Sequence, residues 1–139
     1  MPIRILSSSD VRSALPMSQA IQAMKQAFGQ LSAGNATMPL RTRVATDKGV
    51  VLVMPAYLEQ TKNLGIKIVS VDEKNPQVNL PTVTANVLVL DPETGQVKAL
   101  IDGNSLTAIR TGAAGGLAAQ LLARENAQIV ALFGAGVQA

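Results

Sequence analysis

The sequence contains no cysteine and no histidine among its 139 residues. The absence of cysteine excludes disulfide bonds, a thiolate nucleophile and cysteine-ligated zinc or iron–sulfur sites. The absence of histidine removes the commonest general base and the commonest transition-metal ligand, so we expect no metal site. Any proton transfer must therefore depend on Lys, Asp or Glu side chains, or on the single tyrosine, Tyr57.

Aromatic residues and long apolar runs are also scarce. One Tyr and two Phe offer little surface for stacking on bases, and the net charge of +3 comes from scattered basic residues, so we expect no nucleic-acid binding. No apolar run approaches the roughly 20 residues of a membrane span, and the N-terminus does not read as a signal peptide. The apolar content of 47% is enough to fill one core. We therefore expect a globular cytoplasmic protein without a membrane partner.

The first third of the chain predicts a strand and two helices. Residues 3–6 read as a short strand, and Ser7 to Asp10 offer several N-caps for a helix that Pro16 interrupts. A second helix can begin at Pro16 and end at Gly34. Its apolar residues recur at helical spacing, as expected for a helix that covers a sheet: Ala20, Met24, Ala27, Phe28 and Leu31.

In the middle of the chain, the hydrophobic pattern changes from helical spacing to the period of two that is typical of β-strands. Turn residues at 46–49 and 91–95 each separate two β-branched runs, which indicates two hairpins, and a further run lies between them. The predicted strands cover residues 41–45, 50–54, 64–71, 84–90 and 96–101. The expected fold is α/β, with an α+β N-terminal domain whose largely antiparallel sheet of five or six strands is flanked by helices.

A helix rich in small residues follows the sheet. Asp102 to Ser105 can cap it, and it should extend to about Ala123. Gly115 and Gly116 are adjacent inside it and would each cost about 1 kcal/mol relative to Ala, so another backbone or a ligand should approach closely. We place a domain boundary after residue 126, which gives a first domain over 1–126.

The last residues form a possible nucleotide-binding motif. The apolar run 128–133 leads into Gly134-Ala135-Gly136-Val137-Gln138-Ala139, a G-x-G-x-x-A pattern typical of the first strand and turn of a dinucleotide-binding βαβ unit. An incidental glycine turn is the alternative. Under the first interpretation, residues 127–139 are the first strand and Gly-rich turn of a truncated Rossmann domain, and NAD cannot be distinguished from NADP.

Four basic residues are candidates for a site. Lys67 alternates with apolar neighbours, so it is either an edge-strand charge or a functional amine in a half-buried pocket, where burial would lower its pKa. Arg41 and Arg43 lie two residues apart and form either a solvated basic face or a fork that binds a carboxylate. Arg110 is either a surface charge or a group that reaches a phosphate.

Six sequence blocks in order resemble the ornithine cyclodeaminase and mu-crystallin family. The blocks are MPLRT at 38–42, VMPAY at 53–57, GIKIV at 65–69, LPT at 80–82, DGNSLTAIRT at 102–111 and GAGVQA at 134–139. Together they span essentially the whole chain. The resemblance implies an N-terminal substrate-binding and dimerising domain followed by a Rossmann domain, in a homodimer.

The same resemblance assigns roles to individual residues. It implies that Arg41 and Lys67 contact the carboxylate of the substrate. It implies that NAD or NADP is bound by Thr82, Arg110, Gly134, Gly136, Val137 and Gln138. In the alanine dehydrogenase branch the residue matching Lys67 is the proton donor and acceptor. In the cyclodeaminase branch this role belongs to an aspartate of the Rossmann domain, which no position of this chain matches.

The implied activity is hydride transfer at the Cα of a small amino acid or its imine. It would convert ornithine to proline with release of ammonia, oxidise alanine or reduce a ketimine. The isolated chain should be inactive and should bind NAD very weakly or not at all. Such chemistry requires neither His nor Cys, because the nicotinamide supplies the reactivity. Two alternatives stay open: a non-enzymatic ligand-binding or structural protein of mu-crystallin type, and a dimerisation module without a ligand.

Overall fold

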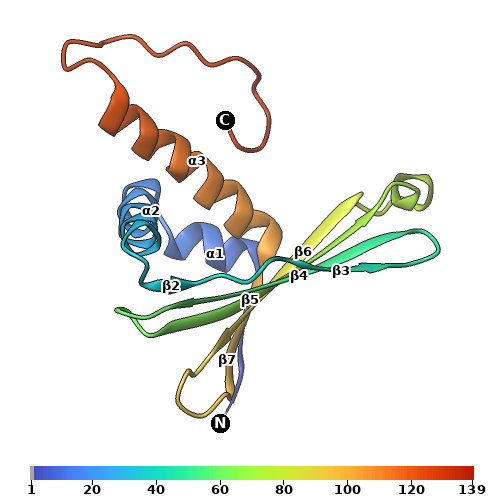
Figure 1. Cartoon of the computed structure of the whole chain (residues 1–139). Coiled ribbons are helices and arrows are strands. Elements are labelled where there is room, and N and C mark those ends of the chain that lie inside the picture. The colour runs from blue at the N-terminus through green and yellow to red at the C-terminus, as the bar shows by residue number, and fades with distance from the viewer. Residues whose placement is uncertain (1) are drawn as a thin grey trace.

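The computed structural model describes residues 2–139 and has one sheet with helices on one face (Figure 1). The helices are α1 (Ser8–Ala14), α2 (Met17–Ser32) and α3 (Gly103–Leu122), with a short 3-10 helix, η1 (Asn75–Val78). The strands are β1 (Arg4–Leu6), β2 (Ala36–Thr37), β3 (Thr42–Ala45), β4 (Gly49–Leu58), β5 (Asn63–Asp72), β6 (Val83–Leu90) and β7 (Val97–Asp102).

The sheet has the order β1-β7-β6-β5-β4-β2, and β3 also pairs with β4. All pairs are antiparallel except β1 with β7. The predicted α/β class and largely antiparallel sheet are therefore confirmed. The sheet has seven strands rather than five or six because β2 contributes a further pair to β4. A strand of two residues is too short to produce the alternating pattern by which strands are predicted.

Local sequence signals determine where the helices begin. Ser7 and Asp10 form a capping box at the start of α1, and Pro16 separates α1 from α2. The carboxylate of Asp102 accepts a hydrogen bond of 2.8 Å from the backbone N–H of Ser105, which caps α3. Both hairpin turns also form where they are predicted.

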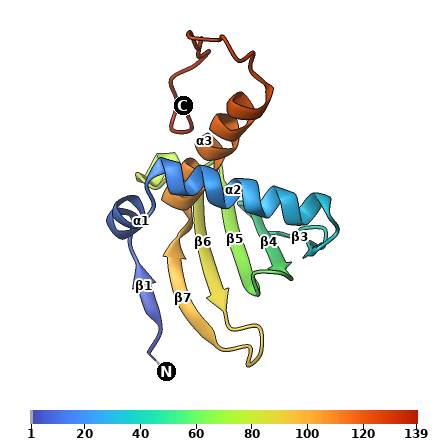
Figure 2. The ribbon, with the colours of Figure 1, turned by 90° about the vertical axis from the view of Figure 1, so that its left-hand side faces the viewer.

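All three α-helices lie on the same face of the sheet (Figures 1 and 2). Helix α3 starts at the sheet and extends away from it beside α2. The small side chains of α3 permit this approach, because a Cβ at Gly116 would lie 3.1 Å from Cδ1 of Ile21. The neighbour at Gly116 is thus a side chain of α2 rather than the expected backbone or ligand, and a Cβ at Gly115 would meet nothing within 4 Å.

No helix of the described residues covers the other face, which we call the open face. Strand alternation places Ile66 and Ile68 there, since the intervening Lys67 points toward α3. Apolar side chains of this face are exposed: Ile5 by 75%, Val44 by 50% and Ile68 by 36%. An apolar sheet face of this kind is typical of a protein–protein interface.

The predicted strand at residues 129–133 is wrong for this structure, which shows no strand after α3. Ile129 is 89% exposed and Phe133 is 97% exposed. A strand requires a hydrogen-bonded neighbour, and no segment of residues 2–139 pairs with this run. The segment instead turns back beside α3 (Figures 1 and 2), where a Cβ at Gly112 would lie 3.3 Å from the carbonyl oxygen of Gln138.

Candidate functional site

Lys67 lies on the helix-covered face of the sheet, at the centre of β5. Its register partners are Met54 on β4 and Val87 on β6, both apolar. These side chains line a cavity of about 340 Å³ between β4, β5 and β6. The lysine therefore presents a cationic group to a mostly apolar surface, as one of the two interpretations of the sequence predicts.

The amine of Lys67 is held by helix α3. Its Nζ donates a hydrogen bond of 2.6 Å to Oγ1 of Thr107, and Thr107 Oγ1 donates to the backbone carbonyl of Gly103. Partial burial lowers the pKa of Lys67 below its usual 10.5, and the positive charge of Arg110 lowers it further. A larger fraction of the amine is therefore neutral than for an exposed lysine, which suits a proton acceptor.

Arg110 lies three residues after Thr107 on α3, and its side chain is exposed. It lines a second cavity of about 350 Å³ between α2, α3 and the end of β4. Leu58 and Asn63 line both this cavity and that of Lys67, so the two cavities adjoin. Arg110 and Lys67 thus line neighbouring cavities, and the charge of Arg110 acts on Lys67.

Arg41 directly precedes β3 and is exposed. The first residue of β3, Thr42, pairs with Val53, while the next residue of β4, Met54, pairs with Lys67. This register brings Arg41 beside Met54, two strands from Lys67, a separation of roughly 10 Å. Continuing the alternation of β3 places Arg41 on the same face as Lys67.

The predicted cofactor residues fall into two groups. Gln138 approaches Gly112, so the Gly-rich turn lies beside the middle of α3. Thr82 is placed elsewhere, directly before β6, where its carbonyl oxygen accepts a hydrogen bond of 2.9 Å from the N–H of Asp72. Thr82 lies five residues before Val87, roughly 16 Å along the strand direction from the level of Lys67.

The Gly-rich turn leaves room for a ligand. Gly134 has a φ of +90°, which favours glycine, and a Cβ at either Gly134 or Gly136 would meet nothing within 4 Å. The turn lines an open pocket with a volume of about 490 Å³, together with Leu132, Phe133, Val137, Gln138 and Ala139. This open backbone fits close approach of a pyrophosphate, although no helix of the described chain follows it.

Thr107 is the site residue whose role the sequence did not reveal. Its partner Lys67 is 40 residues away, and no local pattern links a threonine inside a helix to a lysine inside a strand. The sequence indicated only that Thr107 lies near Arg110.

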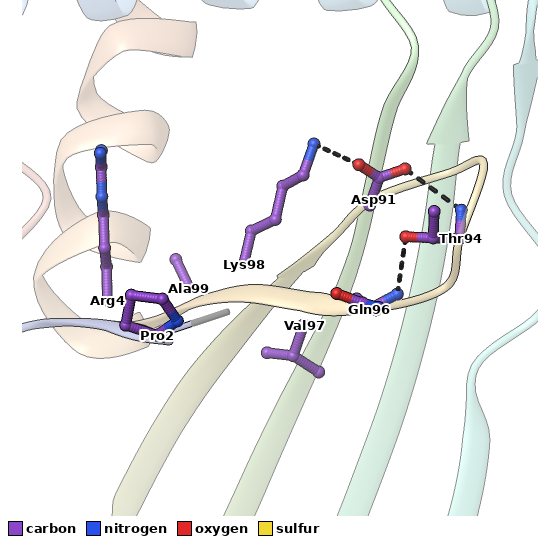
Figure 3. Close-up of a pocket in the computed structure, with 8 residues that line it drawn as sticks. All are labelled: Pro2, Arg4, Asp91, Thr94, Gln96, Val97, Lys98 and Ala99. Carbon is purple, nitrogen blue, oxygen red and sulfur yellow. Dashed lines mark hydrogen bonds and ion pairs between the residues drawn. The ribbon is translucent and has the colours of Figure 1, made fainter.

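A larger cavity, about 800 Å³, lies at the start of β7, beside the hairpin turn that precedes it (Figure 3). Arg4, Lys98 and Asp91 line it, and Lys98 Nζ lies 2.6 Å from Asp91 Oδ2. Asp91 also accepts hydrogen bonds from the N–H groups of Glu93 and Thr94, as expected of a residue that closes a hairpin turn. None of the predicted site residues lines this cavity, so its size does not make it the candidate site.

Two further findings apply to residues 2–139 alone. No group of three or more acidic residues is arranged to hold a metal ion. No α-helix in this range is long and apolar enough to cross a bilayer.

Comparison with known proteins tests the resemblance. The sequence profile of the ornithine cyclodeaminase/mu-crystallin family matches residues 3–139. The chain belongs to this family. The predicted family membership is thereby confirmed for essentially the whole sequence.

The relatives of this family member include enzymes and their solved structures. Alanine dehydrogenase of Archaeoglobus fulgidus is 39% identical over 139 residues, which are 100% of this chain and 42% of that protein. The structure of Thermococcus litoralis Δ1-pyrroline-2-carboxylate reductase with NADH and L-proline is 41% identical, with a TM-score of 0.85 over 98% of this chain and 43% of that one.

A further solved structure, an archaeal alanine dehydrogenase dimer with bound NAD, is 38% identical to this family member. Its TM-score is 0.89 over 99% of this chain and 42% of that one. The chain thus spans less than half the length of the relatives that it matches.

Proposed function

We propose that this chain forms the N-terminal, substrate-binding part of an NAD(P)-dependent enzyme that acts at the Cα of a small amino acid or its imine. The observation that best supports this is the Lys67 amine in its mostly apolar cavity, with its pKa lowered by burial and by the charge of Arg110. The solved relatives that hold NADH with L-proline, or NAD, support the same chemistry.

Residues of this chain would contribute to cofactor binding at the Gly-rich turn. Gly134 and Gly136 leave space for a pyrophosphate, and Val137 and Gln138 continue the turn near α3. Two further residues complete the proposed set of cofactor contacts. They are Arg110, through its guanidinium, and Thr82, through its hydroxyl at its separate position before β6. When bound, the nicotinamide supplies the acceptor or donor of the hydride.

The cationic residues would bind and orient the substrate. Arg41 and Lys67 would contact its carboxylate, which fixes the position of Cα. Neutral Lys67 would accept the proton that the substrate amine loses as the C=N bond forms, and its protonated form would return that proton in the reductive direction. Desolvation favours this role because it brings the pKa of the lysine closer to neutral pH.

We propose that the complete protein is a homodimer and that the open face of the sheet is its interface. Exposed apolar side chains of β1, β3 and β5 lie on this face, and a solved relative is a dimer. An interface of this kind would remove a large apolar surface from water, which is the main driving force for stable association.

The proposal is tested on the complete protein that contains this chain. L-alanine, L-proline and L-ornithine are supplied with NAD⁺ or NADP⁺, and cyclic ketimines with NADH or NADPH, while nicotinamide absorbance and product formation are followed. We expect turnover with at least one pair and a loss of at least about 100-fold in kcat for Lys67→Met. Saturable ligand binding without turnover on any pair would instead support the mu-crystallin type of binding role.

A further inference from the structure

We propose that Thr107 is a positioning residue that aims the amine of Lys67 into the cavity between β4, β5 and β6, an inference that rests on the proposed function of Lys67. The basis is a chain of two hydrogen bonds that runs from Lys67 Nζ to Thr107 Oγ1 and on to the carbonyl of Gly103. The donor and the acceptor in each of these hydrogen bonds can be determined from the chemistry of the groups involved.

A threonine hydroxyl has one proton and two lone pairs, whereas a carbonyl oxygen can only accept. The proton of Thr107 is donated to Gly103, so its oxygen must accept from Lys67. A neutral amine bound in this way uses one N–H for Thr107. Its other N–H and its lone pair then remain free for a group bound in the cavity that Lys67 lines with Met54 and Val87.

The threonine is itself held firmly. Helix α3 is fixed on the sheet by contact of Gly103 with the backbone of Ala85 and by the Asp102 cap. A β-branched side chain inside a helix has few χ1 rotamers, and the bond to the Gly103 carbonyl selects one of them. Thr107 is therefore a rigid acceptor for a lysine whose own side chain is flexible.

Other groups in the described part of the chain do not replace Thr107. Its hydroxyl is the sole hydrogen-bond partner of Lys67 Nζ within residues 2–139, and no carboxylate in that range forms an ion pair with Lys67. The register neighbours on β4 and β6 are apolar. Arg110 on α3 is the charged group that acts on Lys67, and it repels the ammonium.

The test compares Thr107→Val, which removes the hydroxyl at nearly constant shape, with Thr107→Ser, which keeps it. Thr111→Val makes the same change one turn later on α3, where the hydroxyl is buried without a partner in residues 2–139. NMR titration of ¹³C-labelled lysines in this chain follows Lys67, which is assigned by its absence in Lys67→Met. In the complete protein, kcat, KM and their pH profiles are measured for the same variants.

We expect Thr107→Val to lower the pKa of Lys67 further, because the ammonium loses an acceptor, while Thr107→Ser and Thr111→Val keep the wild-type value. In the complete protein, Thr107→Val should lower kcat by at least about tenfold with a smaller change in KM, and Ser should restore most of it. The acid limb of the kcat profile should move to lower pH.

The positioning role would be overturned if Thr107→Val kept the wild-type pKa of Lys67 and the wild-type kcat. It would also be overturned if Thr107→Ser lost as much kcat as Thr107→Val. If the complete wild-type protein has no turnover on any substrate, the proposed function fails. The NMR titration then still decides whether Thr107 controls the Lys67 amine.

Discussion

Gly103 lies against Ala85 so closely that a Cβ on Gly103 would be 2.6 Å from the backbone carbonyl carbon of Ala85. This contact joins the first residue of α3 to the third residue of β6. Because Thr107 is one turn further along α3, the same contact determines how far Thr107 is from Lys67 on the neighbouring strand.

Gly103→Ala should destabilise the fold. The added methyl group meets backbone atoms that cannot rotate away, so α3 must shift, at a cost of about 2–3 kcal/mol in the free energy of unfolding. Chemical denaturation followed by circular dichroism measures this loss. Gly115→Ala is the matched control, because a Cβ there meets nothing within 4 Å and Ala favours the helix by about 0.5–1 kcal/mol. Equal stability of the two variants would contradict the structure at this contact.

Lys67→Met should stabilise the chain at neutral pH. The pKa of Lys67 is below 10.5 in the folded state, so between the folded and unfolded values the unfolded chain binds more protons. The stability of the wild type therefore falls as the pH decreases through this interval, and Met removes the effect. Urea denaturation at pH 7 should show a modest gain, since the amine is only partly buried. The gain in stability should shrink as the pH is raised past 10.5. A loss of stability at pH 7 would contradict the desolvation of Lys67.

Asp91→Asn should alter the response to acid. The hydrogen bond from Lys98 and those from the Glu93 and Thr94 backbones lower the pKa of Asp91 to about 2. Its contribution to stability is complete above the usual value of 3.8 and is lost as the pH falls through about 2. The variant should therefore lose less stability than the wild type over that interval in acid titrations of the free energy of unfolding. Parallel curves would show that the Lys98 pair is not maintained in solution.

Ile68→Lys should prevent dimer formation by the complete protein. The substitution places a charge on the open face, where burial in an interface would require its desolvation. Sedimentation velocity should show a dimer for the wild type and a monomer for the variant at micromolar concentrations. Ile68→Val, which keeps the face apolar, should remain a dimer. A dimer of the lysine variant would place the interface elsewhere.

The sheet and its helices were largely predictable because their signals are local. Alternating side chains, turn residues at 46–49 and 91–95, the Asp102 cap and the break at Pro16 each act within a few residues. The two-residue strand β2 lacks such a signal. The run 129–133 has the composition of a buried strand, but composition cannot supply the neighbouring strand that its hydrogen bonds require.

For the candidate site, the sequence predicted which residue types take part but not how they are arranged in space. The sequence by itself determined that this chain contributes neither His nor Cys, that Lys67 is in a strand among apolar residues, and that the chain matches its family from residue 3 to residue 139. The tertiary structure decided that Lys67 meets Thr107, that Arg110 lines the adjoining cavity and that Thr82 lies apart. Such contacts depend on strand register and on the angle at which α3 leaves the sheet. Both are set by packing between segments tens of residues apart, which no local pattern records.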